Sequence, residues 1–518
     1  MTRKSAVLTS LLLSTALIAS ACSSGGDSNG QGGTPNTAES SGSASKSTVE
    51  VRWMRGENPA QAVKQDTPVI GEILAKTGVK INLEPVPGSN YEDKKRALLA
   101  TNNIPDIIGI TASDAAEFAG TGMFLTISDY FDRMPNFQKV METNPEIKKL
   151  FIDGKLYSLP VAEHFKIQGG KAPMIRMDIL EKLDLAVPTT FDELYDVLKK
   201  MKEAYPDSYP FSSRGIPAFL DAFAFGMGGG FGMTYDDETG AYFYGQNKPE
   251  FKEVLTFLNR LYSEGLLDPD FAINTKQNWD EKMSTGKSFF YYDNNSFAVN
   301  YTAALQQAEP GARFDRIPYL KNAKGDIRGW LYPKGWLTDN YAISSDTKNP
   351  EAVIDMFDWM YGEEGTNVTN YGIEGQTFEI VDGQPKMTDA TLEKYKGSTD
   401  PARVMLSEIG AGLLALAVHV DEGPFTQLSD PNLVRWGEEL VNDPGARYAP
   451  ALVPAFTSEE TKLIKGITSK TAPLEEDVVK FVMGIKPLTE FDQWAEQLTK
   501  AGAEQLENIY NEALKRVQ

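Results

Sequence analysis

The stretch Thr48–Asn58, TVEVRWMRGEN, begins the part of the chain whose pattern decides the predicted fold. Apolar Val49, Val51 and Trp53 alternate with polar neighbours, which predicts a β-strand with one buried face. Trp53 shares that face, so we expect it to be a core residue.

Two helices and two further strands are predicted after this first strand. Residues 61–77 and 91–101 carry apolar side chains at helical spacing. Residues 79–83 alternate in polarity, and 104–108 form a short apolar run. The β-α-β-α-β order predicts an α/β fold with a parallel sheet and right-handed crossovers. In such sheets ligands bind outside the carboxyl ends of the strands.

Helices are also predicted further along the chain. A helix over 191–204 begins with a predicted capping box, in which Thr190 caps the helix and Glu193 reaches back. Another helix spans 249–264, and a long helical stretch runs from 489 to 517.

The N-terminal residues predict export. Arg3 and Lys4 form a positive head, and Val7–Ala19 is mostly apolar and uncharged. Small residues then precede Cys22, the only cysteine. This pattern is typical of a secretory signal, and the apolar run is shorter than the roughly 20 residues of a membrane span. We expect residues 1–21 to be a signal peptide.

Cys22 stands where bacterial lipoproteins carry their lipidated cysteine, so we expect fatty acylation, for example by palmitate. Residues 22–47 are rich in Gly, Ser, Asn and Thr, which predicts a disordered tether. The expected location is the outer side of the cell membrane, to which the lipid is the only attachment. The alternative is ordinary secretion with an incidental free cysteine.

Composition narrows the classes of function. The 518 residues are 41% hydrophobic and 24% charged, and the part after the tether is long enough for more than one core. A net charge of −21 argues against binding nucleic acid. Only two histidines, His164 and His419, are present, which makes His-based metal sites and most catalytic triads unexpected. We predict no cofactor.

No stretch of sequence predicts an enzyme. Gly286–Ser288 resembles the end of a phosphate-binding loop, but Glu281 occupies the position of its first glycine. The run Asp236–Glu238 precedes Thr239-Gly240, which favours a solvated turn. We therefore predict no catalytic residues. A surface glycosidase or lyase, tethered in the same way, stays open as the alternative, because the two carboxylates of a glycosidase need not be close in sequence.

Several short motifs occur in a consistent order along the chain. They are Asn103–Ile107, Asp153–Tyr157, Arg176–Leu183, Pro188–Leu194, Leu261–Pro269, Lys348–Ala352 and Tyr371–Gly375. With the N-terminal lipoprotein signal, this order resembles the family 1 extracellular solute-binding proteins of ABC transporters. The resemblance is greatest to the long lipoprotein branch with LipO-like and alginate-binding members, and it covers nearly the whole chain after the tether.

The resemblance implies a two-lobed periplasmic-binding-protein type 2 fold. Each lobe is expected to hold a mostly parallel sheet flanked by helices, and hinge crossovers are expected to join the lobes. We expect the N-terminal lobe to comprise 48–165 with about 300–395, and the C-terminal lobe 166–299 with about 396–518. The implied function is a monomer that captures an oligosaccharide in the cleft and delivers it to a membrane permease.

Candidate ligand residues follow from the chemistry of sugars, whose rings stack on aromatic faces and whose hydroxyls bind planar polar groups. Irregular segments between elements often carry such residues. The candidates from aromatic-rich segments are Trp330, Trp336, Arg328, Trp279, Tyr292 and Asp293. The strand-end argument adds Arg55 and Glu57.

The resemblance also indicates where a calcium site would be expected. Alginate-binding-like members carry a calcium loop after the helix that corresponds to 191–204. Here the stretch Lys202–Pro210 offers Asp207 and Glu203, lacks glycine and contains two prolines. Calcium needs six to eight oxygen ligands, so we predict no metal in this loop. The other acidic run, Asp236–Glu238, is a weaker cation candidate.

Overall fold

The computed structural model describes residues 48–58, 61–164, 167–216, 218–333, 336–398, 400–450 and 452–517. The predicted signal peptide, Cys22 and the tether lie outside the described residues. No helix in the described part of the chain combines the length and the apolar character that a membrane span requires.

The buried side chains form two large hydrophobic cores, each around its own sheet. We call the first lobe the segments 48–164 and 336–428, whose side chains pack in one large core and in a smaller cluster formed in part by the alternate residues of the same strands. The second lobe is formed mainly by 170–331, 431–448 and 474–503, whose side chains pack in the other. Residues 300–331 and 402–420 thus lie in the opposite core from the expected lobe assignment. We propose lobe boundaries near 332 and 430 instead of near 300 and 395.

A six-stranded sheet forms the centre of the first lobe, in the order β14-β4-β11-β3-β1-β2. Its strands are β1 (Val49–Glu57), β2 (Val79–Pro87), β3 (Ile107–Ile110), β4 (Leu159–His164), β11 (Trp336–Ile343) and β14 (His419–Asp421). β1 is parallel to β2 and β3, as the sequence predicts. β11 is antiparallel to β3 and β4, so the sheet is mixed.

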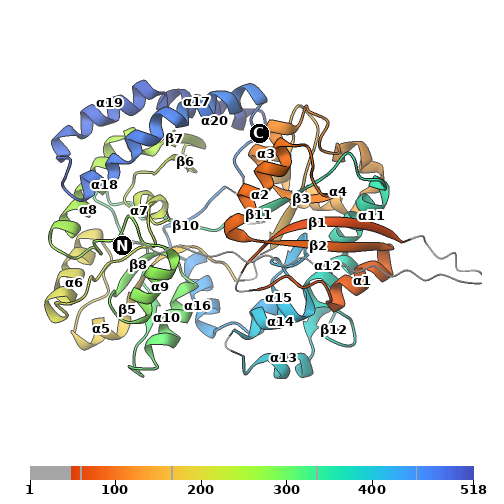
Figure 1. Cartoon of the computed structure of the whole chain (residues 1–518). Helices are drawn as coiled ribbons and strands as arrows, with labels where there is room; N and C mark the ends of the chain where they lie inside the picture. Colours follow the sequence, from red (N-terminus) through yellow and green to blue (C-terminus); the bar gives the residue numbers. More distant parts are fainter. Residues whose placement is uncertain are drawn as a thin grey trace, which may run out of the picture. The chain divides into compact units, whose positions relative to one another are not determined.

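Helices flank this sheet (Figure 1). The remaining elements of the first lobe are α1 (Pro68–Thr77), α2 (Gly88–Ala100), α3 (Ala112–Phe118), η1 (Ile127–Arg133), α4 (Pro135–Thr143), η2 (Pro145–Leu150), α11 (Pro350–Tyr361), α12 (Glu363–Tyr371), β12 (Phe378–Val381), β13 (Gln384–Met387), α13 (Asp389–Tyr395), α14 (Pro401–Ile409) and α15 (Gly423–Thr426). Trp53 is fully buried, and its ring meets Tyr341 edge-on at 5.0 Å, which confirms it as a core residue.

The second lobe contains small sheets instead of one large parallel sheet. β5 (Lys171–Arg176) is antiparallel to both β8 (Phe290–Asn294) and β9 (Phe314–Arg316). The expectation of a mostly parallel sheet is therefore wrong for this lobe. Residues 177–289, which contain several helices and a hairpin, separate β5 from β8 in the chain, so the simple β-α-β unit that makes neighbouring strands parallel is missing.

Two strand pairs and a set of helices complete the second lobe. β6 (Met233–Asp236) and β7 (Ala241–Tyr244) form a hairpin, and β10 (Gly329–Leu331) pairs with β15 (Ala446–Tyr448). The helices are α5 (Met177–Lys182), α6 (Phe191–Ala204), α7 (Leu220–Gly226), η3 (Gly245–Asn247), α8 (Pro249–Ser263), α9 (Lys276–Ser284), α10 (Phe297–Leu305), α16 (Pro431–Val441), α18 (Asp477–Val482), η4 (Leu488–Glu490) and α19 (Phe491–Ala501).

Two C-terminal helices, α17 (Ser458–Glu475) and α20 (Ala503–Lys515), pack on each other and on the second lobe, and α17 also contacts the first lobe. α20 lies along β7, and α17 reaches α3 of the first lobe, where the Ser458 hydroxyl donates to the Ala116 carbonyl at 3.3 Å (Figure 1). The chain passes from one core to the other after 164, after 331, between 428 and 431, and after 448. At these crossings, segments that are far apart in the sequence lie close together in the folded chain.

Candidate functional site

A cavity of about 350 Å³ lies where residues 331–333 and Ala449, Pro450, Leu452 and Val453, from two of the crossing segments, meet the second lobe. We call it the crossover cavity. Its walls are rich in aromatic side chains and hold one pair of opposite charges. These residues are Phe231, Tyr235, Tyr242, Trp330, Tyr332, Lys171 and Asp221. Aromatic surface with a few polar groups is the usual lining of a small-molecule site.

Trp330 is held in place by its strand and by a second aromatic ring. It lies in β10, opposite Arg447 of β15, and it is partly exposed. Its ring stacks on Phe225 with a centroid distance of 3.8 Å and an interplanar angle of 19°. The Arg328 guanidinium lies 4.8 Å from the Phe225 centroid. The indole is therefore supported from behind while it lines the cavity.

Two glycines allow this strand to approach the start of β5 closely. A side chain at Gly170 would place its Cβ only 2.6 Å from the Trp330 carbonyl oxygen, and one at Gly169 would meet the Tyr332 ring at 2.9 Å. The Tyr332 amide donates to the Gly169 carbonyl at 3.0 Å. Only residues without a side chain fit here, so these glycines set the position of the aromatic wall.

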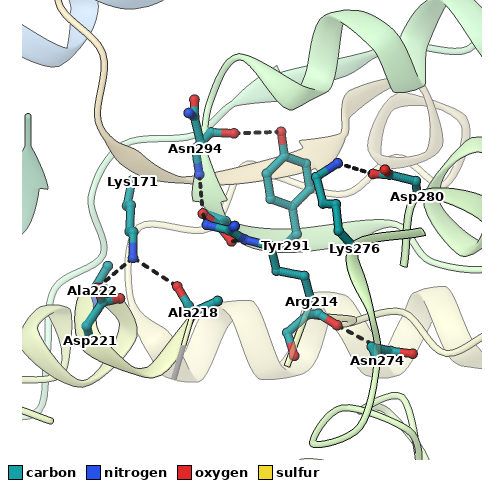
Figure 2. Close-up of polar contacts among 12 residues, drawn as sticks. Lys171, Arg214, Ala218, Asp221, Ala222, Asn274, Lys276, Asp280, Tyr291 and Asn294 are labelled. Carbon is teal, nitrogen blue, oxygen red and sulfur yellow. Dashed lines mark hydrogen bonds and ion pairs between the residues drawn. The ribbon is translucent and has the colours of Figure 1, made fainter. Parts of the chain in front are cut away.

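Lys171 and Asp221 form the charged pair of the cavity. The Lys171 amine donates to an Asp221 carboxylate oxygen at 2.5 Å and to the Ala218 carbonyl at 2.9 Å, so it reaches from β5 to α7 (Figure 2). The Asp221 side chain is 46% exposed. Desolvation by the surrounding protein raises the pKa of Asp221, and the positive charge of Lys171 opposes that rise.

The hairpin β6–β7 forms another wall, and α20 holds its free edge. Asn511 donates to the Tyr242 carbonyl and accepts from the Tyr242 amide, both at 2.8 Å, as a neighbouring strand would. Glu507 accepts from the Tyr244 amide at 2.9 Å. At the turn of the hairpin, Arg328 donates to Asp236 at 3.1 Å.

A smaller cavity of about 260 Å³ lies at the carboxyl ends of β1 and β3 in the first lobe. It is lined by Arg55, Gly56, Tyr91, Gly109 and Tyr341, among others. Arg55 is almost fully buried, with its guanidinium 5.6 Å from the Tyr341 centroid. The strand-end argument therefore leads to a real concavity, and Arg55 lines it.

A larger cavity, about 620 Å³, lies elsewhere, between η2 and the chain around Phe456 and Arg516. Phe151 and Phe456 line it, and Arg516 is bound by Glu460 at 2.7 Å. The crossover cavity is smaller, but it combines more aromatic rings with a charged pair. Its composition therefore makes it the better candidate site.

The predicted ligand residues divide into several groups. Trp330 lines the crossover cavity and Arg55 the strand-end cavity. Arg328 lines neither: it is nearly buried and braces Phe225 and the hairpin turn. Glu57 lies at the end of β1 outside these cavities. Only the backbone of Trp336, in β11, is described.

Trp279 and Tyr292 are core residues, so a ligand-contacting role is a wrong expectation for both. Trp279 is fully buried, with the rings of Tyr291 and Tyr301 edge-on at 5.4 and 5.5 Å. Tyr292 is buried because both faces of β8 are covered. Asp293 is also buried, and both of its oxygens accept from Arg214, at 2.6 and 3.1 Å, which makes it a supporting residue.

Sequence reasoning missed Lys171, Asp221 and the tyrosines of the hairpin. The Phe- and Gly-rich run 211–231 was a weak signal, because α7 with Asp221 lies inside it. Nothing local in the sequence marks Lys171 or Tyr242, which reach the cavity through contacts with α7 and α20.

No cluster of three or more His, Cys, Asp or Glu side chains suited to a metal occurs in the described ranges. In the stretch Lys202–Pro210 the Lys202 amine donates to the Ser208 carbonyl at 2.6 Å and lies 4.9 Å from the Tyr209 ring. Asp236 and Asp237 contact Arg328 and Arg447. The absence of a bound metal stays a prediction.

Comparisons with known proteins agree on one family. The model of the bacterial extracellular solute-binding proteins matches residues 59–367. A polygalacturonan/rhamnogalacturonan-binding protein, YtcQ of Bacillus subtilis (strain 168), is 25% identical over 488 residues, 91% of this chain and 92% of its own. Lipoprotein LipO of the same organism is 24% identical over 492 residues, 90% of this chain and 93% of its own.

A solved structure shows the same fold. The alginate-binding protein AlgQ2, crystallised without calcium ion, superposes with a TM-score of 0.74 at 21% identity and covers 91% of this chain and 99% of its own. This likeness confirms the expected α/β substrate-binding-protein fold, with two lobes.

Proposed function

Because this chain belongs to the bacterial extracellular solute-binding proteins, we propose that it captures a carbohydrate, an oligosaccharide in particular, in the crossover cavity. It then delivers the sugar to the permease of an ABC importer. The relative YtcQ is named for binding polygalacturonan and rhamnogalacturonan, which supports a sugar as the ligand. The family membership itself makes the chain a solute-binding protein.

The observation that carries the proposal is the partly exposed Trp330, stacked on Phe225 and lining a cavity that also holds a polar pair. The apolar face of a sugar ring matches an indole, and its hydroxyls match the Lys171 amine and the Asp221 carboxylate. The ring face of Trp330 opposite Phe225 receives the sugar.

Binding without chemical change is the expected activity. Asp221 is the only carboxylate among the described residues that line the crossover cavity, whereas hydrolysis of a glycoside generally requires two placed across the bond. Asp221 is also bound to Lys171 at 2.5 Å. A tethered glycosidase or lyase is the competing function.

A lipid on Cys22 keeps the protein outside the cell and attached to its membrane. The likeness to lipoprotein LipO supports this anchor. Replacing Cys22 by Ser is expected to release the protein into the medium or to leave it unprocessed. Normal processing and membrane attachment of the Cys22→Ser variant would exclude the lipid anchor.

A thermal-unfolding screen of the chain from Ser23 onward, against oligosaccharides of different composition, tests the proposed function. A ligand at about 100 times its dissociation constant adds about 2.7 kcal/mol of stability. Mass spectrometry after long incubation should recover that ligand intact. Shorter products would support the glycosidase or lyase instead, and a screen in which no sugar stabilises the protein would contradict carbohydrate binding.

A further inference from the structure

The charges around the crossover cavity indicate which class of sugar it accepts. Resting on the proposed function, we propose that this cavity selects electrically neutral oligosaccharides and rejects uronates, the acidic sugars that make up polygalacturonan. The inference separates this chain from the similar YtcQ, which is named for an acidic polysaccharide.

The cation that lines the cavity is already neutralised. Lys171 and Asp221 are the charged residues among its described lining, and they contact each other at 2.5 Å. The Lys171 side chain is 17% exposed and the Asp221 side chain 46% exposed, so an entering ligand meets more of the carboxylate than of the amine. A uronate would have to approach that carboxylate.

The cations that surround the cavity are also matched by carboxylates. Arg214, which interacts electrostatically with the lining residues Tyr332 and Asp221, binds Asp293 at 2.6 Å. At the hairpin turn, Arg328 lies 3.1 Å from Asp236. Specific binding of a carboxylate generally relies on a cation that can give it charge-assisted hydrogen bonds, and each of these cations already gives them to the protein.

Two further cation–carboxylate pairs lie near the hairpin wall. Arg447 lies 3.3 Å from Asp237, and Lys149 lies 2.7 Å from Glu146. Burial, and then the nearby carboxylate of Glu146, raise the pKa of Tyr242. The tyrosine hydroxyl therefore stays protonated, and the charges near this wall are paired. The net charge of −21 on the whole chain adds a long-range repulsion of polyanions.

The Lys171–Asp221 pair is well suited to binding a neutral sugar. One Asp221 oxygen accepts from Lys171 and the other from the Ala222 amide at 2.6 Å, and each oxygen keeps a lone pair for a sugar hydroxyl. The Lys171 amine gives two of its three hydrogens to the protein, so the third can donate to a hydroxyl. Trp330 supplies the apolar face for the ring.

Replacing Asp221 by Asn should change the affinity for neutral sugars and the affinity for uronates in opposite directions. A neutral sugar loses a strong acceptor, so its affinity should fall about tenfold. A uronate loses a repulsive charge, so its affinity should rise. Isothermal titration of the chain from Ser23 onward, with neutral gluco-, xylo-, manno- and fructo-oligosaccharides and with oligogalacturonates and alginate oligosaccharides, measures both. Asp192→Asn, on the exposed side of α6, is the matched control.

The outcomes separate the inference from the function on which it rests. Neutral oligosaccharides should bind, with affinities that salt changes by less than about twofold, and Lys171→Gln should weaken them too. Binding of uronates alone, strengthened in Asp221→Asn and weakened by salt, would overturn the inference and leave carbohydrate capture intact. Binding of no sugar from either group would overturn both. Thermal unfolding of each variant shows that it is folded.

Discussion

Trp330 is the single residue on which the proposed binding depends most. Its indole is held by Phe225 at 3.8 Å, so it is positioned before any sugar arrives. Replacement by Ala should weaken sugar binding by about 1–3 kcal/mol, using the stacking of bases on aromatic side chains as an analogue. Isothermal titration measures the change.

Two other tryptophans serve as controls for Trp330→Ala. Trp359→Ala, on α11 of the first lobe, should leave affinity unchanged because Trp359 lies away from the cavity. Trp494→Ala removes a fully buried ring whose Nε1 donates to the Leu474 carbonyl, and it should lower the free energy of unfolding by about 3–5 kcal/mol. Normal affinity in Trp330→Ala would remove this residue from the site.

Asp268 makes stability depend on pH. It is fully buried and accepts hydrogen bonds from Ser212 at 2.6 Å, from Asn274 at 2.9 Å and from Lys282 at 2.8 Å. Burial alone would raise the pKa of Asp268, but these bonds outweigh it and hold the pKa below its usual value. The folded state therefore favours the ionised carboxylate.

The sign of the effect follows from this lowered pKa. The stabilisation is fully present above the unfolded pKa of about 3.9, and it is lost as the pH falls through the lower folded pKa. Asp268→Asn should cost about 2–3 kcal/mol at pH 7. Urea unfolding should show that the difference in the free energy of unfolding between wild type and Asp268→Asn becomes smaller in acid. A difference that stays constant from neutral pH to about pH 2 would contradict this role of Asp268.

At the scale of elements, the C-terminal helix α20 positions the hairpin wall of the cavity. Asn511 satisfies both backbone groups of Tyr242, so Asn511→Leu leaves an amide and a carbonyl of β7 without these partners. The free energy of unfolding should fall by about 1–3 kcal/mol, and the affinity for sugar should fall as well, because Tyr242 lines the cavity.

Asn508→Leu is the control, since Asn508 lies on the exposed side of α20. Urea unfolding and titration calorimetry together give both quantities for each variant. Unchanged affinity in Asn511→Leu at reduced stability would show that α20 supports the fold without shaping the site.

Sequence patterns predict some elements well and others hardly at all. The β1-α1-β2-α2-β3 series follows from polar alternation and helical spacing, and α6 has the predicted bounds. Its Thr190 side chain accepts from the Glu193 amide at 3.1 Å, and the Glu193 carboxylate accepts mainly from the Thr189 amide and hydroxyl, at 2.7 and 2.8 Å. A spacing rule predicts the cap but not which neighbour completes it.

The site is harder to predict than these elements because its residues meet only in the folded chain. Trp330 could be proposed from its irregular, aromatic-rich surroundings, whereas Trp279, in similar surroundings, lies in a cluster of aromatic rings. The position of Tyr242 depends on Asn511, which lies far along the chain. Sequence alone gives no signal for contacts of such separation.

At the scale of the whole molecule, few segments connect the two cores, which favours hinge motion between the lobes. We predict that a bound sugar, held against residues of the crossing segments, reduces the radius of gyration. Small-angle scattering of the chain from Ser23 onward, with and without saturating sugar, measures this change. An unchanged radius at proven saturation would contradict closure while leaving binding intact.

The most direct test of the central claim is a crystal structure of the protein with the tightest sugar from the screen. The account predicts a sugar ring against the Trp330 face opposite Phe225, with hydroxyls bonded to Lys171 and Asp221. A sugar bound elsewhere, for example in the larger cavity beside Phe456 and Arg516, with the crossover cavity free of ligand, would contradict it.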